Sequence, residues 1–138
     1  MKQFMCITLV VFMVITFSAC EKNYTHGEYR ITIATDCIKN NKVGNDWRIY
    51  YYCDEKKFSN GDTVIKPLDS LVTIEAVFIE DDVYPDEGSS KISIFLRDEA
   101  NKTFEVWVVE DNGPYDGNIA IWEVEVNIEL VRKKQVEA

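Results

Sequence analysis

Two short segments of the chain concentrate carboxylate side chains that could hold a metal ion. One spans residues 80–87 and the other spans residues 110–118. Neither segment contains lysine or arginine, so its carboxylates repel one another unless a cation offsets their charge. Hard oxygen ligands of this kind suit Ca²⁺. The pattern therefore predicts a calcium site with Asp81, Asp82, Asp86, Asp111 and Asp116 as candidate ligands; the alternative is that both segments are solvated loops.

Residues for enzymatic catalysis are scarce. The chain has a single histidine, His26, which precedes the predicted domain, so no Ser–His or Cys–His pair can form inside it. A glycine-rich phosphate loop and an H-E-x-x-H motif are both missing from the sequence. A chance pair of neighbouring carboxylates is expected among 24 acidic residues and does not by itself indicate a glycosidase. We therefore expect a protein without enzymatic activity.

Alternation of apolar and polar side chains predicts a β domain over residues 29–138. The clearest strand places Trp122, Val124, Val126, Ile128 and Leu130 on one face, with Glu123, Glu125 and Glu129 on the other. The full set of predicted strands covers residues 29–33, 47–53, 63–65, 72–78, 92–97, 104–108 and 122–130. Short strands separated by turn residues favour an antiparallel sandwich or barrel. We expect an all-β, antiparallel β-sandwich of about seven strands.

The two acidic segments are expected to share one end of that sandwich. Each connection in an antiparallel arrangement reverses the chain, so loops separated by two strands emerge on the same side. An acidic loop end of this kind is similar to that of C2 domains, β-sandwiches that bind Ca²⁺ through such loops. The segment Asp81-Asp82-Val83-Tyr84-Pro85-Asp86 departs from the spaced Asp-x-Asp pattern of those loops. The fold is accordingly expected to be immunoglobulin-like or C2-like.

The first twenty residues read as an export signal. Lys2 provides a positive start, residues 4–17 form an uncharged apolar run, and Phe17-Ser18-Ala19-Cys20 follows. The run is shorter than the roughly 20 residues that a membrane-spanning helix needs. A cysteine directly after small residues resembles the lipobox of bacterial lipoproteins. The resemblance implies a signal peptide over residues 1–19, a lipid on Cys20 and a tether over residues 20–28, with plain secretion as the alternative.

Export also changes the interpretation of the four cysteines. Cys6 lies in the signal and Cys20 carries the lipid, which leaves Cys37 and Cys53. Exported domains reside in oxidising compartments, so the remaining pair is predicted to form one disulfide, with two free thiols as the alternative.

Net charge and aromatic residues limit the classes of molecule that the protein is expected to bind. The formal net charge of −9 argues against nucleic-acid binding. The rings of Tyr50, Tyr52 and Trp107 are predicted on the outward faces of their strands, where they could form a patch that binds a carbohydrate or a protein. The alternative is that these faces are covered and that the rings belong to the core.

We expect a lipoprotein of the bacterial cell envelope, held at the bilayer by its lipid and acting as a binding module. The alternative is an acidic inhibitor of a basic foreign enzyme, similar to lysozyme-inhibiting lipoproteins.

Overall fold

The computed structural model describes residues 23–135, which fold into eight β-strands without a helix. None of the described elements could therefore cross a membrane as a helix. The expected signal peptide and Cys20 lie outside the described residues. The strands are β1 (His26–Asn40), β2 (Trp47–Cys53), β3 (Lys56–Phe58), β4 (Thr63–Pro67), β5 (Leu71–Glu80), β6 (Asp86–Phe95), β7 (Glu99–Val109) and β8 (Ile119–Lys134).

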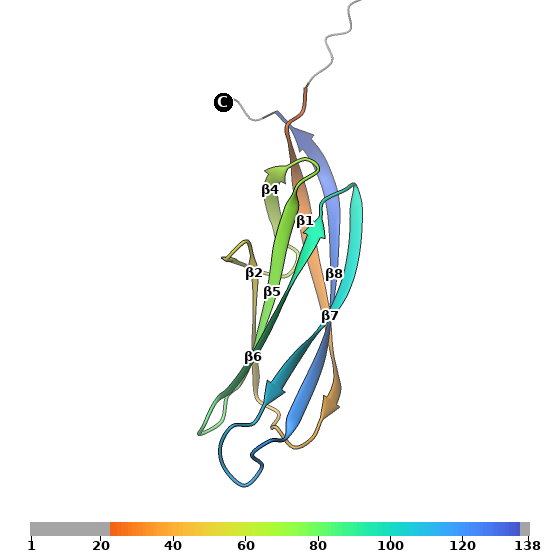
Figure 1. Cartoon of the computed structure of the whole chain (residues 1–138). Coiled ribbons are helices and arrows are strands. Elements are labelled where there is room, and N and C mark those ends of the chain that lie inside the picture. The colour runs from red at the N-terminus through yellow and green to blue at the C-terminus, as the bar shows by residue number, and fades with distance from the viewer. Residues whose placement is uncertain (1–22, 136–138) are drawn as a thin grey trace, which may run out of the picture.

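The strands form two four-stranded sheets that pack face to face (Figure 1). The first sheet has the order β4-β1-β8-β7 and the second has the order β3-β2-β5-β6, with antiparallel pairing throughout. The predicted antiparallel β-sandwich is therefore confirmed. Strand β3 was not predicted from the sequence, because the turn before it is formed by Asp54 and Glu55, both with positive φ. Glycine or asparagine would normally mark such a turn.

The sandwich is elongated, and its two ends differ (Figure 1). One end, called here the terminal end, carries the start of β1 and the end of β8, and loops 68–70 and 96–98. The opposite end, called here the tip, consists of residues 41–48, 80–87 and 110–118. The tip contains all of the β1–β2, β5–β6 and β7–β8 loops. The two acidic segments do share one end, as predicted.

Alternating side chains fill the space between the sheets. In β8, Val124, Val126 and Ile128 are almost fully buried, whereas Glu123 and Glu125 are exposed. In β5, the same alternation buries every second residue from Val72 to Glu80. A shift of one residue in either strand would place charged side chains inside, so the core fixes the register of both sheets.

The first strand begins earlier than expected, at His26 rather than near residue 29. Residues 26–28 pair with β4 on one side and β8 on the other. Glu28 accepts hydrogen bonds from Lys134 and Arg132 of β8, with N–O distances of 2.9 and 2.5 Å. These two contacts lower the pKa of Glu28 to about 2. Three residues assigned to the tether are therefore part of the sheet, because β8 supplies both hydrogen-bond partners and counter-charges.

The predicted disulfide between Cys37 and Cys53 is wrong, and both thiols are free. Cys37 pairs with Trp122, whose ring stacks on Phe78. Cys53 instead pairs with Ile74, four residues before Phe78 on β5. Four strand residues span roughly 13 Å, and a disulfide needs Cα atoms within about 7 Å. The two cysteines face the same interior from opposite sheets, but at different heights along the sandwich.

Near the tip, β6 and β7 approach each other across the edge of the sandwich at Gly88. A Cβ atom added to Gly88 would lie 2.2 Å from the backbone oxygen of Trp107 and 2.8 Å from a side-chain carbon of Val108. Gly88 lies within β6, and the absence of a side chain permits this contact between the two sheets.

Replacing Gly88 with alanine should therefore destabilise the domain. The added methyl group meets backbone that cannot rotate away, and overpacking of this kind costs about 1–3 kcal/mol. We expect Gly88→Ala to lower the melting temperature of the full chain by several degrees. Ser89→Ala is the matched control, because Ser89 is exposed on the same strand. Equal melting temperatures for the two variants would show that the close approach does not exist.

Candidate functional site

Three carboxylates are buried in the tip, and each continues the inward-facing side of a strand. Glu80 follows Phe78 on β5, Glu110 follows Val108 beyond β7, and Asp86 precedes Gly88 on β6. Their exposed fractions are 3 %, 7 % and 6 %, respectively. We call these three residues the buried carboxylates. The sequence predicts them in the two acidic loops, with Asp86 as a calcium ligand, although the period-two spacing from Phe78 and Val108 was the signal that Glu80 and Glu110 face inward.

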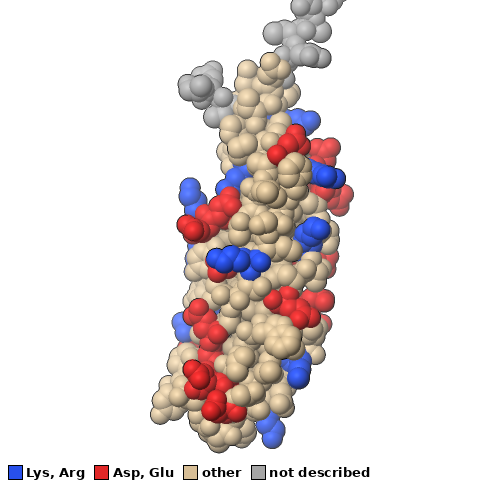
Figure 2. Space-filling view, viewed as in Figure 1, with Lys and Arg blue, Asp and Glu red and all other residues tan. Residues whose placement is uncertain are grey.

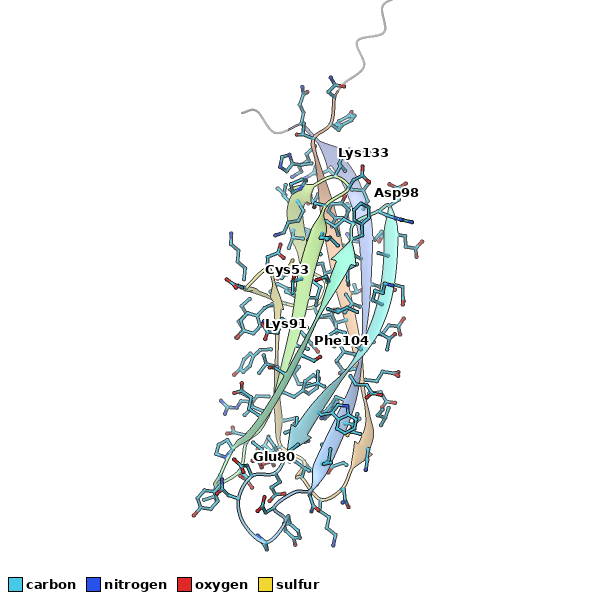
Figure 3. All side chains as sticks on the ribbon, in the orientation of Figure 1. Cys53, Glu80, Lys91, Asp98, Phe104 and Lys133 are labelled. Carbon is cyan, nitrogen blue, oxygen red and sulfur yellow. The ribbon has the colours of Figure 1, made fainter. Side chains whose placement is uncertain are left out.

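Glu80 is the least exposed of the three. It lies at the tip end of β5, near the bottom of Figure 3. Its cross-strand partner in β6 is Asp86, so two acidic residues face each other directly. The loop of residues 41–46 closes over it at Gly44, where a Cβ atom would lie 2.1 Å from Glu80 Oε1. The φ of +112° at Gly44 also favours glycine. Glu80 Oε2 is buried without any hydrogen-bond partner, which is an unusual state for a carboxylate.

Burial and neighbouring carboxylates make Glu80 and Glu110 harder to ionise. The pKa of Glu80 is raised first by loss of water and then by Asp82 and Asp86, against a lowering contribution from the backbone of Asp46. The pKa of Glu110 is raised by loss of water, then by Asp86 and Asp82. The two basic side chains of the tip have other partners: Arg48 pairs with Asp81, and Lys42 lies over the ring of Tyr115.

The structure brings the two acidic loops together without gathering the five predicted calcium ligands into one set. Asp86 Oδ1 accepts a hydrogen bond from the backbone N–H of Asp111 at 3.0 Å, which joins the loops. Asp82 Oδ1 accepts one from the backbone of Tyr84 at 2.7 Å. Asp81 is paired with Arg48, which lies on a neighbouring strand, at 2.8 Å.

Asp111 and Asp116 are exposed on the β7–β8 loop. Within residues 23–135, no three Asp, Glu, His or Cys side chains lie close enough together to hold a metal ion. Calcium binding therefore stays a prediction, and its ligands would have to move together.

The tip also exposes apolar side chains that were not among the predicted site residues. Val83 and Tyr84 on the β5–β6 loop are 85 % and 64 % exposed, and Tyr115 on the β7–β8 loop is 47 % exposed. A cavity of about 410 Å³ lies between these two loops. It is lined by Pro85, Asp86, Glu87, Val109, Asp111 and Asn112. The tip therefore combines acidic, aromatic and concave features on one surface.

The predicted aromatic patch is divided between the two outer faces of the sandwich. Tyr50 and Tyr52 lie on the outer face of the second sheet, where the ammonium of Lys57 is 4.0 Å from the centre of the Tyr50 ring. Trp107 lies on the outer face of the first sheet, and its indole N–H donates a hydrogen bond to Glu105. These rings face outward as predicted, but they cannot form one continuous patch.

Comparison with known proteins adds no family to this description. No protein-family model, curated protein or solved structure matches the chain. The function is therefore argued from the chain's own residues.

Glu80 and Glu110 should make the stability of the folded chain fall as pH rises. Because the folded-state pKa of Glu80 lies above the 4.5 of an ordinary glutamate, the folded chain keeps a proton that the unfolded chain releases. This contribution to stability is complete below pH 4.5 and is lost as pH rises through the folded pKa. Denaturant unfolding from pH 4.5 upward should show a smaller loss of stability for Glu80→Gln than for the wild type.

The control for this experiment is Glu87→Gln, which removes the same charge from an exposed tip carboxylate. The groups around Glu80 are Asp46, Asp82 and Asp86, and those around Glu110 are Asp82, Asp86 and Asp116. All of them remain in both variants. Identical pH profiles for Glu80→Gln and Glu87→Gln would contradict the assignment of a retained proton to Glu80.

The calcium prediction is tested by thermal melts in millimolar Ca²⁺, in Mg²⁺ and in a chelator. A ligand that binds only the folded state stabilises it by about 2.7 kcal/mol at a hundredfold excess over Kd. For a domain of this size, that corresponds to several degrees in Tm. The prediction requires a larger shift with Ca²⁺ than with Mg²⁺. Equal shifts would indicate a screened acidic surface, and no shift would leave the loops without a metal.

Proposed function

We propose that the protein is a bacterial cell-envelope lipoprotein whose β-sandwich acts as a binding module without enzymatic activity. Support for the anchor comes from Phe17-Ser18-Ala19-Cys20 and the apolar run before it, which resemble a lipobox signal. Support for the binding role comes from the sandwich itself, since loops carried by a rigid scaffold commonly serve recognition. The acidic loop end further supports an immunoglobulin-like or C2-like type of sandwich.

The observation that carries this proposal is the placement of the tip relative to the termini. The described chain begins at the terminal end, and the acidic loops lie at the opposite end of the elongated sandwich (Figure 1). A lipid on Cys20 would attach the domain through that terminal end. The tether would then hold the protein at the bilayer while leaving the tip accessible, facing the periplasm or the cell exterior.

Lipidation is tested by the Cys20→Ala variant in a bacterial host. We expect the wild type to incorporate radiolabelled palmitate and to fractionate with membranes. Because the variant lacks the lipid attachment site, it should incorporate no label and be found as a soluble or uncleaved form. Undiminished incorporation in Cys20→Ala would rule out the proposed anchor.

A second candidate function is inhibition of a basic foreign enzyme such as a lysozyme. The observation favouring it is the net charge of −9, which would steer association with a basic target. Added to a lysozyme assay, the full chain should lower the rate of cell-wall lysis, and the effect should weaken sharply with salt. Unchanged lysis at a molar excess of the chain and low salt would exclude this function.

A further inference from the structure

We infer that the tip is the surface through which the domain binds its partner, and that the partner is a protein presenting lysine or arginine side chains. This inference deepens the proposed binding role and rests on it. It assigns a contact surface and a partner chemistry to residues 41–48, 80–87 and 110–118.

The tip carries a strong imbalance of charge. These segments contain nine acidic residues and two basic ones. The acidic residues are Asp46, Glu80, Asp81, Asp82, Asp86, Glu87, Glu110, Asp111 and Asp116. Figure 2 shows one group of acidic side chains on the lower left of the molecule, towards the tip, and others on its upper part. Because Arg48 pairs with Asp81 and Lys42 lies over the ring of Tyr115, a cation from outside would relieve the repulsion among the remaining carboxylates.

Exposed apolar anchors lie among these carboxylates. Val83, Tyr84 and Tyr115 project from two neighbouring loops. Aromatic side chains at the centre of an interface commonly carry much of its binding energy. The Lys42 ammonium lies 5.8 Å from the centre of the Tyr115 ring, so this ring already accepts a cation. Such a surface suits a partner in which basic and apolar side chains alternate.

The cavity between the two loops has room for the end of a long basic side chain. Pro85 and Val109 contribute apolar wall, against which the methylene groups of a lysine or arginine can pack. Glu87 and Asp111, which are both exposed, contribute acceptors for the charged group.

Glu80 supplies an independent indication of a missing cationic partner. It is the cross-strand neighbour of Asp86, and its buried Oε2 has no hydrogen-bond donor. Glu80 lies under Gly44 and beside Asp86, which lines the cavity, and no side chain within residues 23–135 donates a hydrogen bond to this oxygen. A guanidinium or ammonium group bound beside Asp86 would favour the ionised form of Glu80, which burial and the neighbouring carboxylates otherwise disfavour.

The test measures binding of a fluorescent hexa-arginine peptide to the full chain by anisotropy, with hexa-citrulline as the uncharged probe. The tip variant is Asp82→Asn/Asp111→Asn/Asp116→Asn, in which all three residues are exposed. The matched control is Glu123→Gln/Glu125→Gln/Glu129→Gln on the outer face of β8, with the same net charge. We expect the tip variant to weaken binding at least about tenfold, and the control to retain most of it.

A second pair of variants tests the apolar anchors. Tyr84 and Leu71 are both 64 % exposed, but Leu71 lies at the start of β5, away from the tip. The probe here is a peptide that alternates arginine with tryptophan. The Tyr84→Ala variant of the protein should bind this peptide several-fold more weakly than the wild type, whereas the Leu71→Ala variant should bind it equally well. Melting curves of all variants confirm that each remains folded.

Equal loss of affinity in the tip and control variants would overturn the inference, because binding would then follow net charge alone. No binding of hexa-arginine by the wild type would also overturn it. Neither result bears on the lipid anchor, which palmitate labelling tests separately. Binding of lysozyme that survives the tip substitutions would place the partner on another surface and leave the broader binding role intact.

Discussion

The alternation of side chains between the two sheets is the constraint on which this structure depends. Each long strand directs every second residue into one shared core, in which Phe78 and Val126 are fully buried. A shift of one residue would exchange Val126 for Glu125 or Asn127 in β8, and would turn Glu75 of β5 into the core. The cost of burying an unpaired charge is therefore what holds the pairing of both sheets in register.

The same constraint explains why the tip is unusual. The inward-facing positions of β5 and β6, and the one that follows β7, carry Glu80, Asp86 and Glu110 where they reach the tip. Their burial lowers stability at neutral pH, because Glu80 and Glu110 resist ionisation while Asp86 lies beside both. Residues that break a packing rule without an internal partner commonly mark functional positions. This cost supports the inference that the tip meets a cationic partner.

Much of the fold could be predicted from the sequence, because strand alternation is a local signal. The strand over residues 122–130 and the shared end of the acidic loops were recovered in this way. The β2–β3 hairpin was missed because Asp54 and Glu55 adopt positive φ without a glycine. The role of Gly88 could not be predicted from the sequence, because it depends on a contact with Trp107 on a distant segment. The disulfide prediction was wrong for a related reason. Strand alternation predicts which face of a sheet a cysteine occupies, but not how far along the sandwich it lies relative to a cysteine of the other sheet.

The most direct test of this account is a carboxyl NMR titration of the full chain, with Glu80→Gln and Glu110→Gln used to assign the signals. The account predicts that Glu80 and Glu110 titrate above the 4.5 of an ordinary glutamate, whereas Glu28 titrates near 2. Titration of Glu80 and Glu110 at ordinary values would contradict it, because both side chains would then be solvated and the tip would contain no buried charge.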